Sequence, residues 1–124
     1  MTDMKHYQGI YSYSGKFKQQ KNGSKVLDVD EFTYEGKYFK PSNKLVFIIT
    51  PRPEEGGWLS VKCDAIGVII GGNDLEEALG NAFMDAALQY EDLMYSNIPL
   101  TEHAQKIKDL FRNWTVHTID QQAQ

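Results

Sequence analysis

The stretch that decides the fold is GGNDLEEALGNAFMDAALQYEDLM, residues 71–94. Apolar side chains recur in it at spacings of three and four residues, which is the period of an α-helix with one buried face. They are Leu75, Ala78, Leu79, Ala82, Phe83, Ala86 and Tyr90. The pattern predicts a helix from residue 74 to about residue 94, with this apolar stripe lying on a sheet.

The start of this helix has two interpretations. Two glycines precede it, and free N–H groups at a helix N-terminus can hold a phosphate. Asn73 or Asp74 can instead cap the helix, with Glu76 or Glu77 in the capping-box position. Three carboxylates in the first turn would repel a phosphate at close range. We therefore expect a capped structural helix.

Three short apolar segments before the helix are typical of β-strands, and Pro51 is expected to end the first of them. The second segment alternates apolar and polar residues, which predicts a buried face with Cys63 and an open face with Trp58. Gly67, beside the third segment, is expected at a bulge, a bend or a close backbone approach. The predicted strands are residues 45–50, 58–63 and 67–70. Together they form an antiparallel meander.

The two ends of the chain supply the remaining elements. Residues 7–43 contain tyrosine-rich segments separated by turn-forming residues, which indicates further short strands. One of them, KVLDVDEF, alternates imperfectly and is predicted to be a half-exposed or edge strand. A second helix is expected from Thr101 to about Trp114, followed by a possible last strand in TVHTI. The fold class is α+β: a three-stranded meander plus N-terminal strands, packed against one long helix, with a second C-terminal helix.

With 124 residues the chain is expected to form a single domain. Its parts are an N-terminal strand extension, a β-β-β-α core, and a C-terminal helix with a tail: residues 1–43, 44–94 and 95–124. Cys63 is the only cysteine, so no intrachain disulfide can form, and no targeting signal is evident. The longest apolar run is too short to cross a membrane. A cytoplasmic location is therefore expected.

No catalytic centre, cofactor or metal site is predicted. Glu76 and Glu77 point roughly 100° apart on a helix, so they cannot converge on one substrate. The three histidines show no metal-ligand spacing. Cys63 alternates onto the apolar face of its strand, where a thiol is normally inert. A small enzyme with an unrecognised site remains one of three possible functions.

Charge is distributed unevenly along the chain. Residues 1–44 contain eight lysines and five acidic residues, whereas residues 45–124 contain five basic and twelve acidic residues. The acidic part suits a basic protein partner. Lysines beside aromatic residues in the first third could instead bind RNA. The candidates for that alternative are Lys16, Phe17, Lys18, Lys37, Tyr38 and Lys40.

The segment EEGGWLSVKCDAIGVIIGGNDLEEALGNAFMDAALQY resembles the N-terminal domain of HicB-like antitoxins. The matching positions are a double-glycine turn, an aspartate and a glycine after the second strand, and the capped helix start: Gly56, Gly57, Asp64, Gly67 and residues 72–79. The resemblance covers residues 45–94. It implies a partial double-stranded-RNA-binding-like fold that binds a small basic RNA-cleaving toxin and blocks the active site of that toxin.

A protein-binding module of this kind is the first of the three functions, and RNA binding is the second. Candidate partner-binding residues are Trp58, Asp64, Glu76 and Glu77. A homodimer or larger homo-oligomer is expected, because an apolar strand such as KLVFIIT has edges or a second face to cover. The family usually appends a DNA-binding domain that has no counterpart in this sequence. We therefore expect no specific DNA binding by this chain alone.

Overall fold

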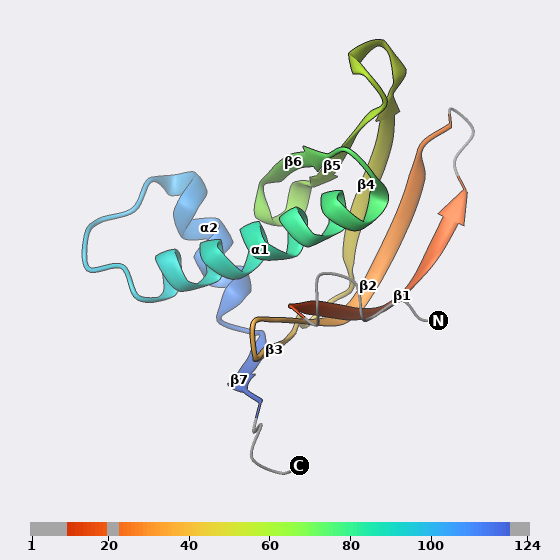
Figure 1. The fold of residues 1–124 in the computed structure, drawn as a ribbon. Coiled ribbons are helices and arrows are strands. Elements are labelled where there is room, and N and C mark those ends of the chain that lie inside the picture. The colour runs from red at the N-terminus through yellow and green to blue at the C-terminus, as the bar shows by residue number, and fades with distance from the viewer. Residues whose placement is uncertain (1–9, 20–22, 120–124) are drawn as a thin grey trace.

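The computed structural model describes residues 10–19 and 23–119 and shows the predicted α+β fold. One curled antiparallel sheet packs with a long helix and a shorter one (Figure 1). The strands are β1 (Tyr11–Gln19), β2 (Lys25–Tyr34), β3 (Lys37–Lys40), β4 (Leu45–Arg52), β5 (Trp58–Cys63), β6 (Val68–Gly72) and β7 (Thr115–Thr118). The helices are α1 (Leu75–Met94) and α2 (Glu102–Phe111), with short 3-10 turns η2 (Pro53–Glu55) and η3 (Asp64–Ile66).

The strand order is β6-β5-β4-β2-β3-β7, and β1 pairs with the other side of β2. The expected meander is present as β4, β5 and β6. Strand β2 pairs with β4 through Lys25–Val29 and with β3 through Phe32–Tyr34. The sheet curls around α1, as Figure 1 shows.

Strand β2 corrects the edge alternative for KVLDVDEF, because the segment is a central strand with partners on both sides, whereas Asp28, Asp30 and Glu31 are partly exposed. Its imperfect alternation comes from a bulge. In the pairing with β1, Ser14 lies opposite Glu31 and Gly15 opposite Val29, which leaves Asp30 without a partner on β1. An extra residue shifts the phase of the side chains. Both Val29 and Phe32 are therefore buried, three residues apart.

Pro51 does not end its strand, because β4 continues to Arg52. Proline lacks an N–H group and is tolerated only where the ladder needs no donor. Pro51 lies opposite Leu59, and the pairing of β4 with β2 stops at Ile49. Proline fits here if Pro51 and Leu59 form a non-hydrogen-bonded pair, because the sheet then needs no N–H donor from Pro51 toward β5. Leu59 then directs its own N–H and C=O groups toward β6.

The start of α1 is capped as predicted, with Asp74 as the N-cap. Its carboxylate accepts a hydrogen bond from the Glu77 N–H at 2.8 Å, and the Glu77 carboxylate accepts one from the Asn73 N–H at 2.6 Å. These side chains occupy the positive end of the helix, where a phosphate would have to bind. Gly67 has a φ of 72° and closes the η3 turn before β6.

The predicted stripe of α1 faces the sheet, with Leu79 2% and Phe83 0% exposed. The ring of Phe83 lies between strands from both parts of the chain. Its neighbours are Tyr11, Tyr13, Phe32 and Phe47, with ring centroids 4.9–5.5 Å away. The N-terminal strands therefore share one hydrophobic core with residues 44–94.

The C-terminal elements also follow the prediction. The Thr101 hydroxyl accepts a hydrogen bond from the Ala104 N–H at 3.1 Å and caps α2. The helix ends at Phe111, before the expected limit at Trp114. Trp114 is still buried and lies edge-on to Phe39, with ring centroids 6.5 Å apart. The predicted last strand is β7, which pairs with β3.

Candidate protein-binding surface

The residues considered for RNA binding on β1 lie on two faces of the sheet. Phe17 is opposite Leu27, whose side chain points into the core, so Phe17 lies on the side of α1. Lys16 and Lys18 alternate with it and lie on the outer face. Lys18 also forms an ion pair with Asp28 at 3.0 Å. The three side chains therefore form no common surface.

The other three candidates for RNA binding lie on β3, beside the opposite end of β2. Lys37 pairs with Glu91 of α1. Tyr38 donates a hydrogen bond to the Glu31 carboxylate at 2.6 Å, and this bond raises the pKa of Tyr38. Lys40 is exposed. The structure therefore does not gather the basic aromatic residues of the first third into one site.

The candidate partner-binding residues on β5 are also separated. Trp58 begins the strand, is 37% exposed, and lies over Gly71, where an added Cβ would be 2.5 Å from the indole nitrogen. Asp64 follows the other end of the strand and lies 3.7 Å from the ammonium group of Lys62. Trp58 and Asp64 are thus divided by the length of β5.

The two remaining candidates, Glu76 and Glu77, lie in the first turn of α1. Both are partly buried. Glu77 is engaged in the cap, and the backbone oxygen of Glu76 accepts a hydrogen bond from the Tyr11 hydroxyl at 3.1 Å. The structure therefore does not bring the four candidates together, and the carboxylate of Glu77 already has a structural role.

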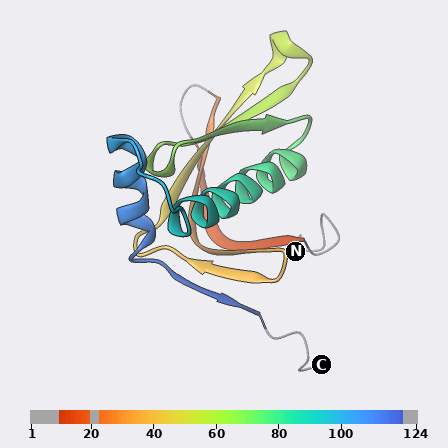
Figure 2. The ribbon, with the colours of Figure 1, turned by 90° about the vertical axis from the view of Figure 1, so that its left-hand side faces the viewer.

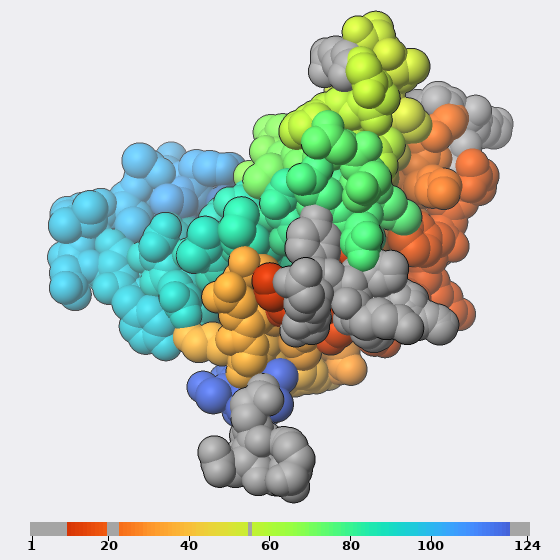
Figure 3. All heavy atoms as spheres, viewed as in Figure 1, coloured from red at the N-terminus to blue at the C-terminus, as the bar shows by residue number. Residues whose placement is uncertain are grey.

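Helix α1 has a second face that is open to solvent. The whole helix carries five acidic residues and no basic one, and two of the acidic residues, Asp85 and Asp92, lie on this face. Asp85, Leu88, Asp92 and Tyr95 follow one another at spacings of three, four and three residues, which places them on one side of the helix. Leu88 is 50% and Tyr95 69% exposed. We call these four residues the acidic helix face, and Figure 3 shows this part of α1, coloured teal, uncovered between β3 and α2.

A groove of about 460 Å³ runs beside the acidic helix face, between α1 and α2. Its lining combines carboxylates, polar side chains and apolar ones: Gly67, Asp85, Gln89, Asp92, Leu93, His103, Ala104 and Ile107. Gln89 donates a long hydrogen bond to the Asp85 carboxylate, at 3.4 Å. No lysine or arginine lines the groove. Apart from His103, the titratable residues of its lining are the carboxylates Asp85 and Asp92.

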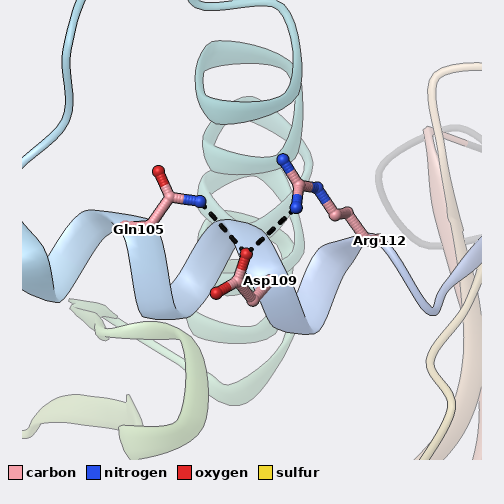
Figure 4. A network of polar contacts seen from close by, with 3 residues as sticks. All are labelled: Gln105, Asp109 and Arg112. Atoms are coloured by element: carbon pink, nitrogen blue, oxygen red, sulfur yellow. Dashed lines mark hydrogen bonds and ion pairs between the residues drawn. The ribbon is translucent and has the colours of Figure 1, made fainter.

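Two other carboxylates on the helices, those of Glu91 and Asp109, have basic partners. Glu91 pairs with Lys37. Asp109 on α2 accepts hydrogen bonds from Gln105 at 3.1 Å and Arg112 at 3.3 Å, as Figure 4 shows. Within residues 10–19 and 23–119, by contrast, neither Asp85 nor Asp92 has an ion-pair partner. Both carboxylates could therefore be neutralised by a cationic partner.

Cys63 has the character of a structural thiol, as its place on the strand predicts. It is 0% exposed, and burial raises its pKa to about 11, which keeps the thiol protonated at neutral pH. Among the described residues, no group of three His, Cys, Asp or Glu side chains could hold a metal ion. Within the same residues, no helix has the length and apolar character that a membrane span requires.

Comparison of the chain with protein-family models, curated proteins and solved structures found no match. The fold and its surfaces are therefore the basis for an inference about function. The acidic helix face was not among the residues singled out from the sequence. A signal for it exists, because a helix with five acidic residues and no basic one has an unusually uniform charge.

Proposed function

We propose that the chain is a protein-binding module of the HicB-like kind, which binds a small basic protein through the acidic helix face. The observation that carries the proposal is the combination of two carboxylates without ion-pair partners in the described residues, Asp85 and Asp92, with the exposed side chains of Leu88 on α1 and of Tyr95 at its C-cap. The resemblance of residues 45–94 to HicB-like antitoxins suggests the kind of partner. That partner is an RNA-cleaving toxin, whose positive surface would complement this face.

Charge and apolar contact have different roles in this proposal. Carboxylates at the edge of an interface mainly steer a cationic partner and set its orientation. Asp85 and Asp92 are two helical turns apart, or about 10 Å along the axis, so they can meet two separate basic side chains. Leu88 and Tyr95 would supply apolar area, which contributes about 25 cal/mol for each Å² removed from water. The groove beside them can admit a side chain of the partner.

The test uses the product of the open reading frame beside the gene of this chain, purified separately, and isothermal titration calorimetry. We expect Asp92→Lys to weaken binding on the order of tenfold, or about 1.4 kcal/mol. Glu54→Lys is the matched control, because it makes the same change of charge on the exposed hairpin between β4 and β5. It should change the affinity by less than about threefold, since only long-range attraction is altered. Leu88→Ser should weaken binding with little dependence on salt.

Three results would contradict the proposal. The wild-type chain could fail to bind the basic protein, or Asp92→Lys and Glu54→Lys could have equal effects. The third result is tight, salt-dependent binding of a single-stranded RNA oligonucleotide, with loss of that binding in the double variant Lys16→Glu, Lys18→Glu. This outcome would favour RNA binding as the function. A gel shift with promoter DNA tests the expectation of no specific DNA binding, because a sequence-specific complex formed by the chain alone would refute it.

A further inference from the structure

The outer edge of β6 presents backbone groups that the sheet does not use. Leu59, Val61 and Cys63 lie opposite Gly72, Ile70 and Val68. If Leu59 directs its N–H and C=O groups toward β6, as its pairing with Pro51 indicates, these three pairs form the hydrogen-bonded ladder.

Ile69 and Gly71 then direct their backbone groups away from β5. One contact supports this assignment, because the Asn81 side-chain amide donates a hydrogen bond to the Gly71 carbonyl at 2.9 Å. The N–H and C=O of Ile69 have no other strand beside them within the described part of the chain. A carbonyl oxygen has two lone pairs, so that of Gly71 can accept a second donor.

Strand β6 also lacks the features by which proteins usually protect an edge. Its sequence, VIIGG, contains no charged residue and no proline, and its pairing with β5 shows no bulge. The edge strand β1 carries Lys16 and Lys18 and pairs with β2 through a bulge at Asp30 of β2, and the edge strand β7 has the sequence TVHT. The apolar strand β4 is no edge, because β2 and β5 flank it. Figure 2 views the molecule from the β6 side, with α1 below the strand.

We infer that two copies of the chain form a dimer by antiparallel pairing of their β6 strands about a twofold axis at Ile70. In this register Ile69 of each copy lies opposite Gly71 of the other, and four backbone hydrogen bonds can form. An axis at Ile69 would instead place Gly71 opposite Gly67. That residue has a φ of 72° and donates its N–H to the Asp64 carbonyl at 3.3 Å, so the strand has ended there.

Side chains on the outer face favour the same register. Ile69 is 76% exposed, which is unusual for an isoleucine on a strand. In the dimer it lies across from a glycine, which leaves room for it, and beside the Trp58 ring that covers Gly71 in the second copy. We expect the side chains of Ile69 and Trp58, which are both exposed in the single chain, to become buried in the dimer. No charge on β6 opposes the approach of two identical strands.

Sedimentation velocity over a series of concentrations tests the dimer. The wild-type chain should sediment at twice its mass of 14.2 kDa, and Ile69→Lys should sediment as a monomer because it places two ammonium groups near the axis. Val46→Lys is the matched control. Val46 is 45% exposed on the same outer face, but β4 is flanked on both sides, so this variant should remain a dimer.

An oxidative cross-link provides a test that does not depend on charge. Residues opposite each other in a non-hydrogen-bonded pair have Cα atoms about 4.5 Å apart, which lies within the range for a disulfide. Ile70→Cys should therefore give a covalent dimer on oxidation, whereas Ile48→Cys on β4 should not. Cys63 is buried and should not compete.

Near-ultraviolet circular dichroism checks that each variant is folded. A wild-type chain that stays monomeric at all concentrations would overturn the inference. Equal dissociation by Ile69→Lys and Val46→Lys would also overturn it, since that result indicates contact between two sheet faces. The dimer does not rest on the proposed function, because it uses neither Asp85 nor Asp92.

Discussion

Phe83 connects the N-terminal strands to the rest of the core, so Phe83→Ala should weaken both parts together. The side chain is 0% exposed. It lies in a cluster with Tyr11 and Tyr13 of β1, Phe32 of β2 and Phe47 of β4, at centroid distances of 5.5, 5.5, 4.9 and 5.4 Å. Truncation would therefore open a cavity bordered by three strands and the helix.

The expected loss is about 4 kcal/mol in the free energy of unfolding. Phe→Ala substitutions in cores typically cost about 3–5 kcal/mol, because the cavity adds to the lost transfer free energy. Aromatic pairs contribute about 0.5–1.5 kcal/mol beyond the area they bury, so this site should lie in the upper part of that range. Small domains are stable by only about 5–15 kcal/mol. The free energy of unfolding of the variant should therefore be small.

Urea unfolding followed by far-ultraviolet circular dichroism and by tryptophan fluorescence measures this loss. If residues 1–43 and 44–94 form one cooperative unit, both signals should change in a single transition for wild type and variant. Leu88→Ala on the exposed face of α1 is the control and should change stability by less than about 0.5 kcal/mol. A loss below about 1 kcal/mol for Phe83→Ala, or two separate transitions, would refute the reasoning.

Three further predictions concern stability. Burial raises the pKa of Cys63 from 9.0 to about 11. The folded chain holds the thiol proton more tightly than the unfolded chain does, which stabilises the fold. This contribution to the free energy of unfolding is complete below pH 9 and is lost as the pH rises to about 11. Urea titrations should show the stability of wild type relative to Cys63→Ala falling by up to about 3 kcal/mol across that window, and a constant difference would contradict the assignment. Asp74→Ala should lower the free energy of unfolding in urea by about 1 kcal/mol through loss of the cap, with Asp74→Asn close to wild type. Gly15→Ala should lower the midpoint of thermal unfolding, with a loss on the order of 2 kcal/mol, because an added Cβ would lie 2.2 Å from the Asp28 carbonyl oxygen; an unchanged midpoint would show that the bulge can relax.

The helices could be predicted closely because their signals are local. The cap at Asp74, the apolar stripe and the second cap at Thr101 all lie within a few residues of the positions they determine. The β4, β5 and β6 strands were accessible for a similar reason, since short turns connect them. Local sequence therefore accounts for most of the α+β architecture.

Strand β2 and Pro51 could not be placed because their positions depend on distant partners. The alternation in β2 changes phase at Asp30, and only the register with β1 shows that a bulge is the cause. Pro51 can stay in its strand because β2 no longer pairs there. Neither condition can be derived from the residues next to them.

The sequence did not place the proposed surface on the acidic helix face. Acidic charge in the second part of the chain predicts a basic partner, and the proposed surface takes two of its carboxylates, Asp85 and Asp92, from that part. The choice among carboxylates required the structure, since Glu77 is engaged in the cap while Asp92 is exposed without an ion-pair partner in the described residues. Hydrogen bonding decides which of several acidic side chains is available.

The two proposed surfaces use different residues, although Gly67, directly before β6, lines the groove beside the acidic helix face. The acidic helix face lies on the solvent side of α1, whereas the dimer would use the edge of β6 and the outer face of the sheet near Trp58. Asp92 is exposed on α1 and is not part of β6, so we expect each chain of the dimer still to bind one basic partner. Asp92→Lys should then leave the dimer intact, and Ile69→Lys should leave the affinity of each chain unchanged. If one substitution abolished both properties, the partner and the second copy would have to share a surface, and the assignment of separate faces would be wrong.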